Sequence, residues 1–400
     1  MSFETALTGL NAASADLDVT GNNIANAGTV GFKGSRAEFA DIFASSGLGV
    51  TQNAIGQGVR LANVAQQFTQ GQFNFTGNSL DLAVNGNGFF RMSDNGEAVY
   101  SRNGAFQLDR DGFIVNSQNQ RLNGFLASPT GSVGGAVGEL QVNVGNVPPQ
   151  ATSSVAVSAN LDSGAADLSG VAFDRNDPDT YNFSTSTTVF DSQGQDYVGT
   201  LYFRHVGTNQ WEMRMEANGQ VRGPTVFDFD ANGNFNSVIS GAPPFGFTTP
   251  SAAPLNIDVD FASLTQFGAP FDVKNLSQDG FAAGQFSNLS VEGDGRIFAR
   301  FTNGQSQTLG QVILARFPSA ENLQQVGDTS WVETFGSGNP VLAAPGSSGL
   351  GNLEAGALEQ SNVNITEQLV QMITAQRNFS ANSQMISTQD QITQEIINIR

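Results

Sequence analysis

The two ends of this chain carry the same long apolar repeat, which constrains the fold more than any other feature. Large apolar residues recur at steps of three, four and seven, with small or polar residues at the intervening positions, which is the heptad pattern of a helix that packs against another helix. At the N-terminal end the repeat consists of Phe3, Leu7, Leu10, Leu17 and Ile24. At the C-terminal end it consists of Ile365, Leu369, Met372, Phe379 and Ile386, and two further large apolar residues, Ile392 and Ile396, follow it. We expect these side chains to be the self-assembly residues of the chain.

The repeats predict amphipathic helices over residues 2–27 and over residues 365–399. Neither Gly nor Pro occurs after Gly356, and Asn364 with Glu367 resembles a capping box at the start of the second helix. That helix would be roughly 52 Å long at ~1.5 Å per residue. Its remaining positions are mostly uncharged polar residues rather than Lys and Glu pairs. Because the chain between the helices indicates β structure, we expect the helices to be buried against other copies of the chain.

Composition excludes several classes of function. The net charge is −19, from 17 basic and 36 acidic residues, whereas nucleic-acid binding requires clustered Lys and Arg. The chain contains no Cys, so disulfides and thiolate chemistry are excluded. It has no stretch of 18 apolar residues, so we expect no membrane insertion. The N-terminus lacks the basic region of a secretory signal peptide, so an exported chain would leave by a route without cleavage.

The chain between the helices is Gly-rich and predicts strands and turns. The expected fold is mainly β, with two all-β domains and a terminal helical coiled-coil domain formed by both end helices. We assign residues 1–28 and 362–400 to the helical domain, 29–70 and 336–361 to a connector, 71–145 and 284–335 to an inner β domain, and 146–283 to an outer inserted β domain. The inner domain is therefore discontinuous in sequence. Within the connector, residues 37–43 are expected to form a short helix.

Alternating apolar residues and turn residues predict the individual hairpins. Residues 107–115 form a strand, a turn at Arg110-Asp111-Gly112, and a second strand. Residues 289–298 repeat that pattern. The repeat indicates that the two segments are paired hairpins of one domain. In the insert, residues 197–206 and 210–215 alternate well and are joined by a turn at 207–209.

No pattern in the chain supports catalysis or metal binding. Asp228, Asp230 and Asn232 match the first half of a calcium loop, but Ile239 stands where that loop needs a bidentate Glu. We therefore interpret the segment as a hairpin turn. His205 is the only histidine and lies in a strand pattern beside aromatic residues, so we expect no Ser-His-Asp triad. We predict no catalytic residue, no cofactor and no metal site.

Several motifs resemble those of the bacterial flagellar rod and hook proteins. The N-terminal motif comprises Asn22, Asn23, Ile24, Ala25 and Asn26, followed after a short spacer by Gly31, Phe32 and Lys33. Near the C-terminus, residues 358–363, 375–379 and 386–388 are similar to the matching end of the same family. Residues 80–90 and 100–106 are similar to segments of both rod and hook proteins. The inserted domain at 146–283 and the segments 303–305 and 309–312 favour the hook proteins over the generally shorter rod subunits.

The resemblance implies a subunit of a tubular helical polymer, with terminal helices lining the inner tube and β domains outside. Such a hook acts as a universal joint that transmits torque from the motor to the filament, outside the cell. The implied partners are other copies of the chain, the distal rod protein, the hook cap protein and the hook–filament junction protein. Phe39 and Phe43 resemble a Phe-x-x-x-Phe motif recognised by the flagellar type III export gate; the alternative is an ordinary apolar pair on a short helix.

Two other functions remain open from the sequence. The first is a distal rod subunit with an inserted domain, since the end motifs are shared across the family. The second is a secreted β-rich hydrolase or adhesin, which would need a concave site with perturbed carboxylates and would leave the terminal helices unexplained.

Overall fold

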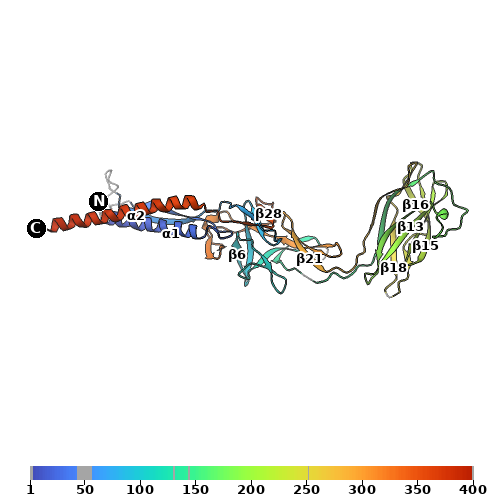
Figure 1. Ribbon diagram of the computed structural model, residues 1–400, viewed down its shortest axis with the longest axis horizontal. Coiled ribbons are helices and arrows are strands. Elements are labelled where there is room, and N and C mark those ends of the chain that lie inside the picture. Colours follow the sequence, from blue (N-terminus) through green and yellow to red (C-terminus); the bar gives the residue numbers. More distant parts are fainter. Residues whose placement is uncertain (1–2, 43–55, 129–130, 143–144, 251, 399–400) are drawn as a thin grey trace. The chain divides into compact units, whose positions relative to one another are not determined.

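The computed structural model describes residues 3–42, 56–128, 131–142, 145–250 and 252–398. The fold is mainly β with one long helix at each end of the chain, as predicted (Figure 1). Two compact units are present. The helix-bearing unit comprises Met1–Val144, Asn288–Ala299 and Ser306–Arg400, and the insert unit comprises Gly145–Ser287 and Arg300–Gln305.

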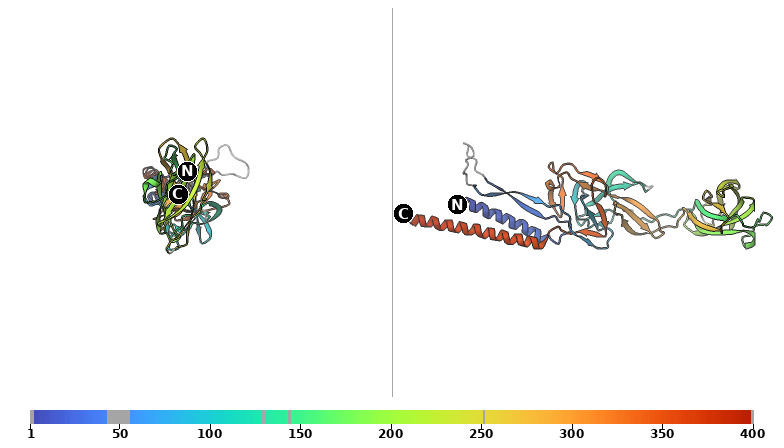
Figure 2. Two further views of the ribbon diagram at one scale, coloured as in Figure 1. Left: turned by 90° about the vertical axis from the view of Figure 1, so that its right-hand side faces the viewer. Right: turned by 90° about the horizontal axis from the view of Figure 1, so that it is seen from above.

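The terminal helices are α1 (Phe3–Ala25) and α2 (Ile365–Asn398), and they lie side by side in opposite directions (Figures 1 and 2). The α1 helix ends at Ala25, within the predicted range, and the Asn26 side chain donates a hydrogen bond to the Asn22 carbonyl. The α2 helix begins after Asn364, whose Oδ1 accepts a hydrogen bond from the backbone N–H of Thr366 at 3.0 Å. Both predicted helices are confirmed over the described residues.

The short helix expected at residues 37–43 is wrong. Residues Ser35–Asp41 form strand β1, which pairs antiparallel with β2 (Val59–Gln66) and lies against α1. An isolated helix of seven residues gains too few hydrogen bonds to offset its nucleation. In the hairpin, by contrast, the backbone groups of the same residues pair with β2 along the whole strand.

The β part of the helix-bearing unit is dominated by one 13-stranded sheet built from two distant parts of the chain. Its central path runs β21-β22-β23-β9-β5-β6-β26-β25, and the other strands pair beside it. The strands are β5 (Phe89–Asp94), β6 (Glu97–Ser101), β7 (Gln107–Leu108), β8 (Ile114–Val115), β9 (Arg121–Ala127), β10 (Val133–Glu139), β21 (Phe286–Val291), β22 (Arg296–Phe301), β23 (Ser306–Val312), β24 (Leu314–Arg316), β25 (Gln324–Gly327), β26 (Ser330–Val332) and β27 (Val341–Ala343). Both predicted hairpins therefore belong to one sheet, which is built from two parts of the chain that lie far apart in sequence.

Two short ladders bring the two ends of the chain to this sheet. Strand β3 (Phe73–Phe75) pairs with β29 (Ala357–Glu359), and β4 (Leu82–Asn85) pairs with β28 (Asn352–Ala355). These ladders position the segment before α2 against the segment after α1. Beside them, an aromatic core contains Phe89, Tyr100, Phe317 and Trp331, and Phe68 packs against it. A short 3-10 turn, η2 (Ala320–Asn322), follows this core.

The insert unit consists of two five-stranded sheets around one core. The first is a meander of β12 (Phe183–Phe190), β13 (Asp196–Gly207), β14 (Gln210–Ala217), β15 (Gln220–Phe229) and β16 (Phe235–Ser240). The second contains β11 (Ser154–Asp162), β17 (Phe245–Phe247), β18 (Leu255–Asp260), β19 (Thr265–Phe267) and β20 (Asp272–Gln278). A 3-10 turn, η1 (Pro178–Thr180), precedes β12. Alternate residues of both sheets, such as Val155, Val157, Phe203, Trp211 and Phe227, fill the core.

Candidate assembly interface and its junction with the β sheet

The two helices meet through small residues. On α1, Ala6, Ala13 and Thr20 are buried at seven-residue intervals, and on α2 Ala375 is fully buried. A Cβ atom added at Gly9 would lie 2.6 Å from Oδ1 of Asn382, so the glycine leaves room for the Asn382 side chain between the helices. We call Ala6, Gly9, Ala13, Thr20, Ala375 and Asn382 the small-residue seam. Part of the burial that we expected between copies is therefore provided within the chain, by residues that we did not select.

The large apolar residues of the repeat do not fill this seam. The most exposed of them have 41–64% of their surface accessible, namely Phe3, Leu7, Ile365, Leu369, Ile392 and Ile396. We call these six residues the outward stripe. The other predicted residues, Leu10, Leu17, Ile24, Met372, Phe379 and Ile386, are half-buried. Val370, Ile373 and Ile397 add further exposed apolar surface to α2. Large apolar side chains that stay accessible along both helices of a soluble protein mark a candidate surface for association.

Asn23 of the N-terminal motif fixes the helix pair to the hairpin. Its side chain is buried, and Nδ2 donates to the Ser35 carbonyl at 2.7 Å and to Oε1 of Gln368 at 3.0 Å. Its Oδ1 accepts a hydrogen bond from the Ser35 N–H at 2.8 Å. One amide therefore joins α1, β1 and α2, which neither a carboxylate nor an apolar side chain could do.

Three of the family motifs converge on a buried ion cluster, which we call the Glu359 junction. Lys33 Nζ lies 2.7 Å from Oε1 of Glu359, and Arg102 Nη1 lies 3.2 Å from its Oε2. The Lys33 and Glu359 side chains are fully buried, and Arg102 is nearly so. The Gly71 N–H also donates to Oε1 of Glu359 at 2.8 Å. The junction thus binds the segment after α1, the segment before α2 and the residue that follows strand β6 together.

Burial and charge act against each other in this cluster. Burial lowers the pKa of Lys33, and the Glu359 carboxylate opposes that shift. Burial likewise lowers the pKa of Arg102, again opposed by Glu359. The carboxylate is thus the one group of the cluster that makes two buried cations tolerable. Arg102 gains further acceptors from the carbonyls of Val84 and Gly86.

The other motif residues shape the backbone around this junction. Gly31 has a φ of +70°, and an added Cβ would lie 2.5 Å from the backbone nitrogen of Asn103, so only Gly fits there. Phe32 is buried beside it. Asn26 is half-buried and closes the end of α1, Ile24 is half-buried, and Asn22 and Ala25 are exposed.

The structure describes one of the two export residues. Phe39 lies in β1, is 40% exposed and lines a hollow beside Ala13 and Asn378 of the helix pair. Phe43 lies outside the described residues. The expected one-turn helical spacing of the two rings does not apply, because Phe39 belongs to a strand.

The patterns that resemble catalytic or metal sites have structural explanations. Asp230 closes the turn between β15 and β16, where its Oδ1 accepts hydrogen bonds from the N–H groups of Asn232 and Asn234. His205 lies on β13 beside Trp211, with ring centroids 5.1 Å apart. Across the described ranges, no group of three or more acidic or histidine side chains is arranged to hold a metal ion. No described helix is long and apolar enough to cross a bilayer.

Sequence reasoning missed the seam, Glu359 and Arg102 as functional residues. The seam had a detectable signal, because small residues recur at positions 6, 9, 13 and 20, each one residue before a position of the heptad repeat. Glu359 and Arg102 stood inside segments selected for their resemblance. Charged residues make up only 13% of the chain. A charged residue inside a motif could therefore have been selected as a candidate functional residue.

Family models match four segments of the chain. They are described as the flagellar basal body rod protein at residues 3–33, the flagellar hook protein FlgE/F/G D1 domain at 83–160, the flagellar basal body protein FlaE D2 domain at 160–281, and the flagellar basal body rod FlgEFG protein C-terminal region at 354–399. The first and last matches include the two terminal helices, and the D2 match falls within the insert unit.

Full-length relatives agree with these segments. The chain is 37% identical to the flagellar hook protein FlgE of Escherichia coli K12, and each chain is covered completely. It is 36% identical to FlgE of Salmonella typhimurium, again over the whole of both chains, and 30% identical to FlgE of Borreliella burgdorferi over 100% of this chain and 99% of that one. The crystal structure of Helicobacter pylori FlgE2 matches 72% of this chain and all of its own with a TM-score of 0.55; at 14% identity it supports the fold alone.

Proposed function

The chain belongs to the flagellar hook protein FlgE family, and from this premise we propose that it is a structural subunit that polymerises with copies of itself into a flexible tube. The observation that carries the proposal is the outward stripe, which leaves large apolar side chains of both terminal helices exposed. The rod-subunit and hydrolase or adhesin alternatives are not favoured, because the full-length relatives are named hook proteins and the family is a structural one.

The energetics of the stripe support association. Burying the six side chains of the stripe, at roughly 1.5–3 kcal/mol for each one taken from full exposure, contributes at most about 9–18 kcal/mol. Association and ordering of the helices cost ~4–15 kcal/mol or more, so the surplus is modest. Subunits with a net charge of −19 repel one another, and salt weakens repulsion beyond a Debye length of ~8 Å at physiological ionic strength. Polymerisation should therefore be concentration-dependent and promoted by salt.

We further propose that the polymer is the hook itself, a universal joint outside the cell between rod and filament. Its neighbours would then be the distal rod protein, the hook cap protein and the hook–filament junction protein. A strain that lacks its own hook subunit tests this assignment. Expression of this chain should restore curved hooks, seen by electron microscopy, and swimming. Cells that gain neither, although the chain is exported, would contradict the assignment.

Export through the flagellar type III gate, without signal-peptide cleavage, is the final part of the proposal. Phe39 and Phe43 are the candidate recognition residues. The strand at Phe39 does not preclude recognition of this segment before the subunit folds. The double variant Phe39→Ala with Phe43→Ala should accumulate in the cytoplasm and disappear from the secreted fraction, whereas the purified variant folds. Normal secretion of the double variant would show that the two residues have no role in export and serve only local packing.

A further inference from the structure

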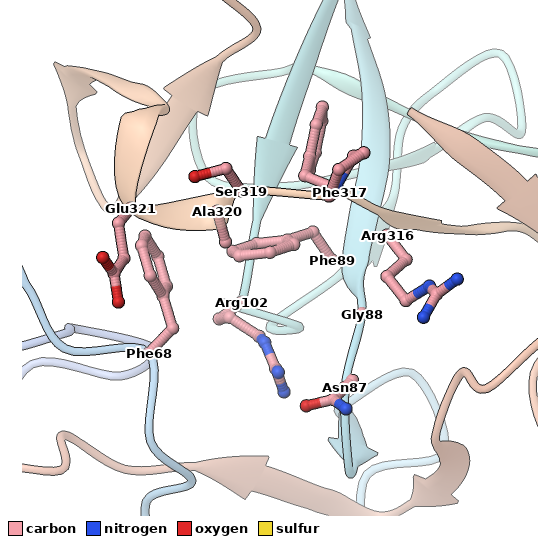
Figure 3. Close-up of a pocket in the computed structure, with 11 residues that line it drawn as sticks. Phe68, Asn87, Gly88, Phe89, Arg102, Arg316, Phe317, Ser319, Ala320 and Glu321 are labelled. Carbon is pink, nitrogen blue, oxygen red and sulfur yellow. The ribbon is translucent and has the colours of Figure 1, made fainter. Parts of the chain in front are cut away.

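A pocket of about 450 Å³ opens on the β part of the helix-bearing unit, away from the seam (Figure 3). Phe68, Phe89 and Phe317 supply aromatic walls, and Arg102 of the Glu359 junction lies below Phe89. Arg316, at the end of β24, stands across the pocket from Phe68 and Glu321. An aromatic hollow with a few convergent polar groups is the usual form of a recognition pocket.

Arg316 is the residue of this pocket whose charge is available to a partner. Its side chain is exposed, and within the part of the chain that the structure describes it forms no ion pair, not even with Glu321 in the same lining. Arg102, by contrast, is already held by Glu359. The lining carries two arginines and one glutamate, whereas the whole chain has 36 acidic and 17 basic residues. The pocket is thus a positive spot on a strongly acidic protein.

A fully exposed aromatic residue stands on the segment next to this pocket. Phe335 is on the turn after β26, and its side chain is fully accessible. The turn is rigid, because the Thr334 N–H donates to Ser337 Oγ at 2.9 Å and Ser337 is completely buried. The Thr334 hydroxyl donates to the carbonyl of Asn322 at 2.7 Å, and the Ser319 N–H donates to the Ser337 carbonyl at 3.3 Å. The Phe335 turn is therefore attached to the segment that forms one pocket wall.

An exposed ring on a rigid turn loses little conformational freedom when it is buried by a partner. Anchors of this kind, aromatic rings and arginines at the centre of a contact, dominate the affinity of protein interfaces. Phe335 cannot serve its own subunit in this way, because it is fully accessible there and does not line the pocket.

We propose that the Arg316 pocket and the Phe335 turn form one contact surface for a second copy of this chain. A carboxylate of the neighbouring copy pairs with Arg316, and an apolar part of it covers Phe335. Charge complementarity selects the occupant, since every copy of a chain with net charge −19 presents many carboxylates. The inference rests on the proposed polymerisation, and it adds a contact between β parts to the contact between helices.

The absence of Cys makes a direct test simple, because one introduced thiol is unique in the chain. Phe335→Cys should react quickly with a maleimide in the monomer and at least about tenfold more slowly in the polymer, as expected for a site at the centre of an interface. Ser117→Cys, at an exposed turn of the same unit, is the control and should react alike in both states. Equal reaction of the Phe335→Cys thiol in monomer and polymer would overturn the inference while leaving polymerisation intact.

A charge reversal tests the pocket itself. Arg316→Glu should raise the concentration needed for polymerisation by about tenfold or more. Arg110→Glu is the matched control, because Arg110 is exposed on a turn of the same unit and the change of charge is equal. If wild-type subunits polymerise and the two variants behave alike, the pocket is not the contact. If wild-type subunits fail to polymerise, the proposed function fails first.

Discussion

Glu359 accepts hydrogen bonds from Lys33, Gly71 and Arg102, which come from three separate parts of the chain. Each donor stands in or beside a segment that positions the terminal helices on the β sheet. A carboxylate whose oxygens are shared in this way fixes geometry more than it adds stability, because burying all three charges is itself unfavourable. We infer that this cluster sets the angle at which the helix pair leaves the sheet.

Removal of the charge on Glu359 should therefore strongly destabilise the helix-bearing unit. Glu359→Gln leaves Lys33 and Arg102 as buried cations with no anion, and this typically costs about 3–5 kcal/mol. Glu38→Gln breaks the exposed ion pair with Arg36 and should cost less than ~1 kcal/mol. Urea unfolding of the helix-bearing unit, followed by helix content, measures both. Equal midpoints for the two variants would contradict a structural role for the junction.

Tyr100 makes the folding stability of the helix-bearing unit decrease at alkaline pH. Burial, reinforced by the Glu333 carboxylate, raises the pKa of Tyr100 to about 12. The unfolded chain ionises near pH 10, so the folded state holds this proton more tightly between about pH 10 and 12. The stabilisation is complete below about pH 10 and is lost as the pH rises to about 12.

Phenolate absorbance measures this proton directly. The difference between the titrations of wild type and Tyr100→Phe should contain one tyrosine with a midpoint near pH 12. A missing component that titrates near pH 10 would show that the phenol is not held by burial.

At the scale of elements, one helix pair has two different faces. The large apolar repeat could be predicted from the sequence because bulky side chains at heptad spacing are rare by chance. The seam could not be selected in the same way, since Ala, Gly and Thr are common throughout the chain and their burial depends on how closely two distant helices approach. Strand β1 was predicted as a helix for a related reason: its conformation is decided by pairing with β2, many residues later.

The Glu359 junction could not be predicted from the sequence either, because it too depends on contacts between distant parts of the chain. The resemblance placed all three residues inside motifs, but nothing local in the sequence indicates that Lys33, Arg102 and Glu359 meet. Their contact follows from the ladders of β3 with β29 and β4 with β28, which are pairings between opposite ends of the chain.

The two helix faces should be separable by mutation. Ala375→Leu adds bulk at a fully buried seam position, and overpacking of this kind costs about 1–3 kcal/mol. Gln376→Leu introduces the same side chain one residue along, at an exposed position. Thermal unfolding of monomeric subunits, followed by helix content, should show a lower midpoint for Ala375→Leu alone. Identical midpoints would mean that α1 and α2 are not paired through this seam.

At the scale of the whole molecule, the two ends of the chain form one helix pair, and the long segment between them forms β sheets. The two helices pack through the small-residue seam, and the Asn23 contacts and the Glu359 junction attach this pair to the hairpin and the β part. The outward stripe stays available for neighbouring copies. With this division we expect the strongly acidic chain to remain monomeric at low concentration and salt, and to polymerise when repulsion is screened.

The central claim is that the outward stripe drives polymerisation. Sedimentation and electron microscopy of purified subunits at rising salt test it most directly, with Leu369→Asp compared with Val198→Asp. Both substitutions place the same charge on an exposed apolar position, Leu369 on α2 and Val198 on β13 of the insert unit. Wild type and Val198→Asp should form tubes, more readily as salt rises, and Leu369→Asp should stay monomeric. Tubes that form equally well from Leu369→Asp subunits would show that the terminal helices are not the core of the polymer.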